Sequence, residues 1–168
     1  MSVFIDSLVR VALDERLLSI GTQFGDNQNE RVIDLGAVGI PKVGGTINIQ
    51  IVGGESPPEM EQEMAWVEAF LLKSPQFIRT PSEAGLSLKL YQYVLWVKTD
   101  KLRGTLTNEV LSGCLEEHFH NNLHLPVGNN VLTILKTYQQ PVVIADNETG
   151  RLFNRVSIDC EIYYKNNN

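Results

Sequence analysis

Hydrophobic and polar residues alternate with a period of two between residues 152 and 164, a pattern that predicts a half-buried β-strand. A shift of one residue would point the large apolar side chains toward the solvent, so the alternation fixes the register of this strand. A second β-rich run, residues 131–138, precedes it, and turn-forming residues occupy positions 146–151. Pro141 interrupts the segment between this second run and the turn. Residues 142–145 are therefore either a bulged continuation of the run or an edge segment.

The longest strand signal covers residues 86–98 and is apolar on both faces near its end. If helices cover one face of the sheet, we expect the other face to meet a second layer of the same chain or a neighbouring subunit. Residues 46–52, which lie between two glycine pairs, also alternate and predict a short strand. From these two strands we predict the interface residues Tyr91, Tyr93, Leu95, Val97, Ile47, Ile49 and Ile51.

Two stretches follow the helical spacing of three and four, residues 3–20 and residues 105–119. Ser2 suits the N-cap of the first helix, and Gly21 suits the position just after its end. Residues 22–31 predict an exposed loop, and no confident element fits residues 32–43. Residues 65–72 fit either a helical face or a strand, whereas residues 76–80 follow Pro75, precede Pro81 and predict a strand.

Runs of antiparallel strands together with two helices predict an α+β fold. We expect a two-layer sandwich in which both main helices pack on one face of a mostly antiparallel sheet. At 168 residues the chain fits a single domain, residues 1–168. Cys114 and Cys160 both fall on apolar faces, which indicates reduced thiols in a core rather than a disulfide.

The chain carries a formal net charge of -6 at pH 7 and no run of lysine or arginine. This balance argues against a surface that binds nucleic acid by neutralising phosphates. No uninterrupted apolar run approaches the roughly 18 residues that a membrane span needs, and the first helix contains Asp6, Asp14 and Glu15. We therefore expect an untargeted protein that folds in a reducing cytoplasm and has no membrane partner.

Three histidines, His118, His120 and His124, form the cluster that invites a metal or catalytic interpretation. Residues on one helical face lie three or four apart, so the first two diverge, and the third lies beyond the expected helix end. The partial negative charge at a helix C-terminus favours cations, which explains His118 and His120 without a role as metal ligands. The sequence contains no Gly-Lys-Ser/Thr phosphate loop, Cys-x-x-Cys pair or Gly-x-Ser-x-Gly elbow. We therefore predict no catalytic, cofactor-binding or metal-binding residues and no enzymatic activity; the alternative is a metal-dependent enzyme that uses the three histidines and Asp159.

The order of elements and several local strings resemble the tail terminator, or tail completion, proteins of long-tailed bacteriophages. The strings are Ala-Leu-Asp-Glu-Arg-Leu at 12–17, Ala-Trp-Val-Glu-Ala-Phe at 65–70, Pro-Gln-Phe-Ile-Arg at 75–79 and Gly-Arg-Leu-Phe-Asn-Arg-Val at 150–156. The long strand to Trp96, the helix at 109–119 and the closing segment 147–164 complete the resemblance, which covers residues 3–20 and 64–164. Residues 21–63 exceed the family's usual helix-to-strand connection and suggest an inserted arm, an extended loop or a hairpin.

The resemblance implies a structural virion protein: a ring, typically of six copies, that caps the head-proximal end of the tail tube, stops its polymerisation and presents the head-joining surface. Its partners would be further copies of itself, the tail tube protein and the head-to-tail connector protein. DNA would pass through the lumen without sequence-specific binding, and an acidic lumen would repel its phosphates. The expected location is the virion tail, after assembly in the cytoplasm of the host cell. The alternative is another ring-forming neck or tail component, such as a head-to-tail connector or a tube protein.

Overall fold

The computed structural model describes residues 4–25, 32–40, 46–52, 64–73, 86–100, 104–140, 144–146 and 151–165. The two main helices are α1 (Ile5–Leu18) and α3 (Gly104–His118); α2 (Gly21–Phe24) is a single turn, and a 3-10 turn covers Leu35–Val38. The strands are β1 (Val32–Asp34), β2 (Thr46–Val52), β3 (Met64–Lys73), β4 (Leu86–Asp100), β5 (His124–Val127), β6 (Asn130–Gln139), β7 (Ile144–Asp146) and β8 (Arg151–Lys165).

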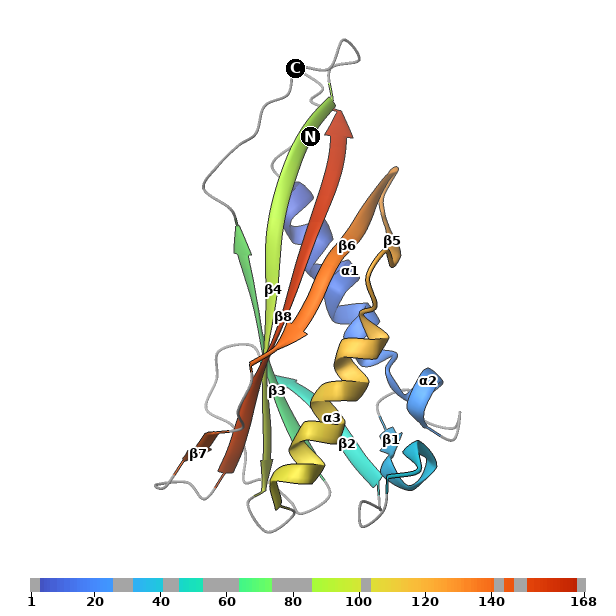
Figure 1. The fold of residues 1–168 in the computed structure, drawn as a ribbon. Helices are drawn as coiled ribbons and strands as arrows, with labels where there is room; N and C mark the ends of the chain where they lie inside the picture. The colour runs from blue at the N-terminus through green and yellow to red at the C-terminus, as the bar shows by residue number, and fades with distance from the viewer. Residues whose placement is uncertain are drawn as a thin grey trace.

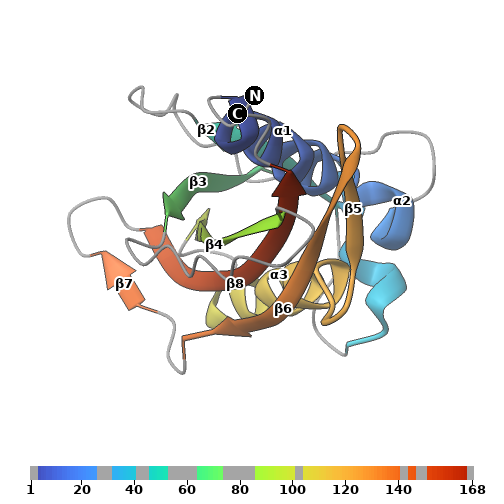
Figure 2. The ribbon, with the colours of Figure 1, turned by 90° about the horizontal axis from the view of Figure 1, so that it is seen from above.

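These strands form one sheet in the order β1-β2-β3-β4-β8-β6-β5, and β7 pairs with one end of β8 (Figure 1). Among the described strands, β2 and β3 run parallel and the other pairs run antiparallel. The centre of the sheet is the pair of 15-residue strands β4 and β8, which are in register from Leu86 opposite Lys165 to Asp100 opposite Arg151. Viewed from above, β8 curves between its neighbours, so that the sheet is curled (Figure 2).

Both main helices pack on the same face of the sheet, which we call the inner face. Tyr91 and Tyr93 of β4 donate hydrogen bonds from their hydroxyls to side chains of α1. Further along the strand, Asn108 of α3 donates to the carbonyl oxygen of Val97 at 3.2 Å and to the Thr99 hydroxyl at 2.9 Å. The odd-numbered residues of β4 therefore point toward the helices, and the even-numbered residues point to the opposite, outer face.

The structure confirms the α+β class, the mostly antiparallel sheet and the two main helices on one face. Residues 65–72 belong to β3, because this segment pairs with β2 on one side and β4 on the other. The strands predicted at 86–98, 131–138 and 152–164 correspond to β4, β6 and β8, and β7 takes an edge position near that expected for residues 142–145. The N-cap of α1 is Phe4 and not the expected Ser2, and the strand predicted at 76–80 lies outside the described residues.

Three local features differ from the sequence-based expectations. β5 was not expected, because a four-residue strand is too short for a clear alternation; it joins β6 through a turn in which Gly128 has a positive φ of 59°. The first helix ends at Leu18 with Ser19 as its C-cap, and Gly21 is the buried first residue of α2. The segment expected to be a loop from residue 22 therefore begins as a helical turn.

Two strands of the region 21–63, β1 and β2, are part of the sheet. β1 and β2 form an antiparallel pair, as a hairpin would, but β2 also pairs with β3. Ile33, Leu35 and Ile47 bury their side chains in the main hydrophobic core. The inserted region therefore contributes a β1–β2 pair that widens the sheet beyond β3.

Candidate functional site

The predicted interface residues of β4 lie inside the protein. Tyr91 is 3% exposed, and Tyr93, Leu95 and Val97 are 0% exposed, because α1 and α3 cover this face of the sheet. The prediction that the helices leave this face open is therefore wrong, and these four residues belong to the core. The open face of β4 is the even-numbered one.

One predicted interface residue of β2, Ile47, is less accessible than expected. Ile47 is buried, and the β2 backbone has a strand on each side. Ile49 and Ile51 lie outside the residues whose side chains the structure describes, so their interface role stays a prediction.

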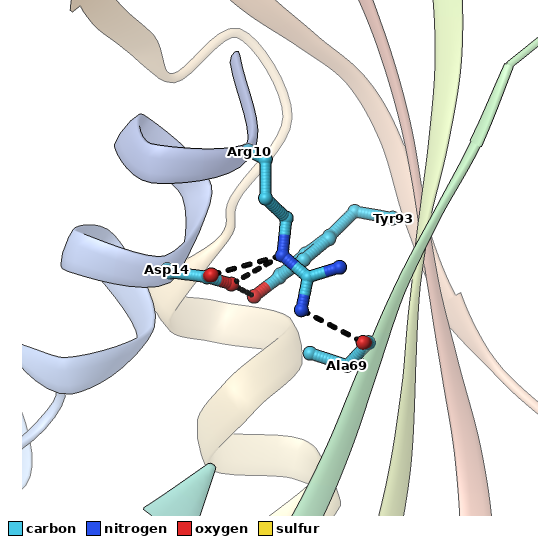
Figure 3. Close-up of polar contacts among 4 residues, drawn as sticks. All are labelled: Arg10, Asp14, Ala69 and Tyr93. Carbon is cyan, nitrogen blue, oxygen red and sulfur yellow. Dashed lines mark hydrogen bonds and ion pairs between the residues drawn. The ribbon is translucent and has the colours of Figure 1, made fainter. Parts of the chain in front are cut away.

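A cluster of charged groups explains why the face of β4 that carries Tyr91 and Tyr93 lies under α1 (Figure 3). The Tyr93 hydroxyl donates a hydrogen bond to the carboxylate of Asp14. Arg10 donates from Nε to both carboxylate oxygens of Asp14, at 3.0 and 2.9 Å, and from Nη2 to the carbonyl oxygen of Ala69 at 2.8 Å. Burial and the negative charge of Asp14 raise the pKa of Tyr93, so the phenol keeps its proton. One cluster thus fixes α1 against both β3 and β4.

A second cluster lies about two helical turns away, toward the N-terminus of α1. Asp6 accepts hydrogen bonds from the Tyr91 hydroxyl at 2.5 Å and from Lys89 Nζ at 3.0 Å, and Lys73 Nζ is 2.8 Å from its other oxygen. Burial alone would raise the pKa of Asp6, but hydrogen bonds from these three donors outweigh burial and lower it to about 2. Helix α1 therefore offers one carboxylate to each buried tyrosine of β4, Asp6 to Tyr91 and Asp14 to Tyr93.

His118 is buried where the three helices meet. Its Nε2 lies 2.7 Å from the carbonyl oxygen of Arg16, and its Nδ1 lies 3.0 Å from Oε1 of Gln23. Burial lowers the pKa of His118 to about 4, so the imidazole is neutral at pH 7. Arg16 Nη2 donates to the carbonyl oxygen of His118 at 2.8 Å. The cation at the C-terminal end of α3 is therefore an arginine of α1, and the interpretation of His118 as that cation is wrong.

The other two histidines and the two cysteines differ in exposure. His120 and His124 are exposed, whereas Cys114 and Cys160 are buried and free. Burial raises the pKa of Cys114 to about 11 and that of Cys160 to about 12, which keeps both as thiols. In the described ranges, no group of three or more His, Cys, Asp or Glu side chains is placed to hold a metal ion.

Large apolar side chains lie on the outer face of the sheet, away from both main helices. We define the outer patch as Phe70 and Leu72 of β3 with Leu135 and Tyr138 of β6, which are between 38% and 49% exposed. Leu72 and Leu135 line a common hollow of about 450 Å³ together with Leu90 of β4. An exposed apolar surface with a hollow of this size is typical of a contact site.

A network of polar side chains holds the centre of the outer face in place. Gln92 Nε2 donates to Asp159 Oδ1 and to the Tyr138 hydroxyl, both at 3.0 Å. Arg155 Nη2 donates to Gln92 Oε1 at 3.1 Å, and the guanidinium carbon of Arg155 lies 5.9 Å from the centre of the Trp96 ring. The polar groups are thus paired with one another before any partner arrives, which reduces the cost of burying them in a contact.

Helix α1 carries a second exposed apolar surface. Phe4, Leu8 and Val11 follow spacings of four and three and are 57%, 46% and 51% exposed, and we call them the α1 stripe. They lie on the side of α1 opposite its buried residues Val9 and Leu13, and Leu8 also borders a hollow lined by Leu86 and Tyr164. In the part of the chain that the structure describes, no helix is long and apolar enough to cross a membrane.

Sequence reasoning missed the outer patch because it assigned the even-numbered residues of β4 to the core. One available signal pointed the other way. A buried tyrosine hydroxyl needs a hydrogen-bond partner, and α1 presents Asp6 and Asp14 about two turns apart. Matching these carboxylates to Tyr91 and Tyr93 would have identified the tyrosine face as the inner one.

No protein-family model matches this sequence, and no curated protein is detectably similar to it. Solved structures with the same fold exist. One, which carries no functional name, has a TM-score of 0.57 at 12% identity and covers 95% of this chain and 96% of that chain. Another, a chain from the virion of a native gene transfer agent (GTA) particle, has a TM-score of 0.54 at 10% identity and covers 95% of this chain and 98% of that chain. The chain therefore shares its fold, over nearly its whole length, with a chain of that virion particle.

Proposed function

We propose that this protein is a structural component of a phage-like virion and, more specifically, a tail terminator. In this role, identical copies form a ring on the head-proximal end of the tail tube, stop its polymerisation and present the surface that joins the head. The observation that carries the proposal is the whole-length likeness in fold to a chain of a gene transfer agent virion. The resemblance of residues 3–20 and 64–164 to tail terminators favours this position within the virion.

Two features of the molecule suit a role in assembly without catalysis. The outer patch and the α1 stripe are apolar surfaces that the described residues leave exposed on the two layers of the domain, and such surfaces mark protein contacts. The acidity of the chain, a net charge of -6, suits a lumen through which DNA slides without binding. The proposed partners are further copies of the chain, the tube protein and the head-to-tail connector protein.

Disruption of the gene in cells that produce the particle tests the proposal. A tube of identical stacked rings offers the same surface after every step, so its growth has no stopping point of its own. We expect electron micrographs to show DNA-filled heads without tails and free tails longer than normal. Heads without packaged DNA would instead identify a connector on the head side, and heads without any free tails would identify a tube component. Normal particles would refute a structural role.

A further inference from the structure

We propose that His118 is an acid-sensitive switch: a proton on its imidazole releases α2 and β1 from the helix layer while the rest of the domain stays folded. The switch does not depend on the proposed virion function, because it concerns one junction inside the chain. This junction joins the C-terminal end of α1, the single turn α2 and the last residue of α3. His118 is 1% exposed there.

The two nitrogens of the ring contact different elements. Nε2 lies 2.7 Å from the carbonyl oxygen of Arg16 on α1, which can only accept, so Nε2 carries the proton of the neutral ring. Nδ1 then holds a lone pair and faces the side-chain amide of Gln23 on α2, 3.0 Å away. This amide can donate to the lone pair through its NH2 group or, after a half-turn, accept from an imidazolium. Nδ1 is therefore the atom that a second proton occupies, and α2 is the element in contact with it.

The groups around the ring oppose a positive charge. Burial is the largest cause of the lowered pKa of His118, and the charges of Arg16 and His120 lower this pKa further, whereas the hydrogen bond to the Arg16 carbonyl raises it. α2 carries no charged residue, and the carboxylate of Asp34 on β1 accepts from the backbone N–H of Gly36. In the part of the chain that the structure describes, no carboxylate pairs with the ring. A protonated ring is therefore most stable where water reaches it.

At this junction, α2 and β1 can separate with the smallest loss of packing. α2 is one turn, and β1 has three residues and, among the described strands, pairs only with β2. β1 and the 3-10 turn after it bury two large apolar side chains, Ile33 and Leu35, whereas α1 alone buries four. Local opening occurs first in elements with few buried apolar contacts.

Gly25 places α2 directly against β1. A Cβ at this position would lie 2.4 Å from the carbonyl oxygen of Val32 and 2.5 Å from that of Gly21, so the end of α2 and the start of β1 are in close backbone contact. Figure 1 shows the two elements next to each other, at the side of the molecule. Opening of α2 therefore moves β1 as well, and it exposes Nδ1 of His118 to water while Nε2 keeps its bond to α1.

The size of the effect follows from the two pKa values of the ring. The pKa of His118 is about 4 when α2 is in place, and a hydrated imidazole has a pKa of about 6.5. The open state therefore binds the proton more tightly, and a decrease from pH 7.5 to pH 5 raises its population by about 30-fold. If the nearby Arg16 lowers the pKa of the open state to about 6, the rise is about 10-fold.

Hydrogen exchange of the full chain between pH 7.5 and pH 5 tests the switch. Each rate is divided by that of an unstructured peptide at the same pH, which gives the opening constant of each amide. The reporting amides are those of β1 and of Gln23, Phe24 and Gly25, whose N–H groups bond to Ile20 and Gly21. The amides of β4 and β8 report global unfolding, which also exposes the ring and has the same dependence on pH. Local opening is therefore recognised by a larger opening constant and by its insensitivity to low concentrations of denaturant.

Two sets of variants assign the dependence on pH. His118→Gln removes the titrating ring. The double variant His120→Gln/His124→Gln is the matched control, because the chain has three histidines and this variant keeps His118 alone. The control also assigns the titration to His118 if His118→Gln does not fold.

We expect the opening constants of α2 and β1 to exceed those of β4 and β8 and to rise by about 10–30-fold between pH 7.5 and pH 5, starting near pH 6–6.5. The rise should persist in the double variant and disappear in His118→Gln. Opening constants of α2 and β1 that do not change with pH, or that equal those of β4 and β8, would overturn the inference. A rise that is lost in the double variant, or retained in His118→Gln, would overturn it as well.

Discussion

Replacement of Tyr93 by phenylalanine tests how strongly the charged cluster holds α1 on the sheet. The change removes one hydroxyl from a residue that is 0% exposed and leaves the ring in place. The lost interaction is a hydrogen bond to the Asp14 carboxylate, and hydrogen bonds to charged groups contribute about 1.5–3 kcal/mol. Asp14 keeps its two contacts with Arg10 and is 30% exposed, so water can replace part of the loss. We therefore expect a loss near the lower end, about 1.5 kcal/mol in the free energy of unfolding.

Urea denaturation followed by circular dichroism measures this loss, with unchanged m values as evidence for an unchanged fold. For a chain of this length the melting temperature should fall by about 3–6 °C. Asp14→Asn, alone and combined with Tyr93→Phe, completes a double-mutant cycle, in which groups in contact show a coupling of about 0.5–3 kcal/mol. Additive effects of the two substitutions, or a loss below about 0.5 kcal/mol for Tyr93→Phe, would refute the role given to this hydrogen bond.

Further predictions concern protonation, thiols and the inserted strand. The pKa of His118 is about 4 in the folded protein, below its usual 6.5. The free energy of unfolding of the wild type should therefore be highest above pH 6.5 and fall by about 3 kcal/mol as the pH decreases toward 4. In urea titrations, His118→Gln should remove this dependence on pH. The pKa of Asp6 is lowered from 3.8 to about 2, so Asp6→Asn should lower the free energy of unfolding by about 1 kcal/mol at pH 7. This difference from wild type should vanish as the pH falls through 2, and a difference that stays constant with pH would contradict the role given to the Asp6 carboxylate. Cys114 and Cys160 should resist thiol reagents in the native protein and both react in denaturant. Ile47→Ala should cost about 2–5 kcal/mol in the free energy of unfolding because Ile47 is buried, and a neutral result would contradict the packing of β2 in the core.

Long alternating segments were the most predictable part of the fold. β4 and β8 each run for 15 residues, and so many alternating positions leave little choice of element or register. β3 was ambiguous because its short apolar run suits a helix or a strand, and its pairing with β2 and β4 decides the matter. Information of that kind lies in other parts of the chain and not in the local pattern.

The candidate surfaces were harder to predict for a related reason. The alternation of β4 shows that both faces are apolar, but it does not show which face the helices cover. That choice depends on contacts between distant residues, such as Tyr93 with Asp14. The environment of His118 likewise depends on Arg16, which lies 102 positions away in the sequence. The resemblance of short sequence strings and of the element order to tail terminators suggested a virion protein, but it could not identify the contact residues.

The central position of β8 has a consequence for how the chain folds. β8 follows every other described strand in the sequence, yet it lies between β4 and β6 and is the strand that joins the two parts of the sheet. Until β8 is in place, β3–β4 and β5–β6 are separate hairpin-like units, each with an open edge that another chain could occupy. Contacts between such distant segments also form slowly. The interval before β8 pairs is therefore the stage at which this chain is most exposed to aggregation, and mutations that weaken β8 should reduce the yield of soluble protein more than their cost in stability alone would suggest.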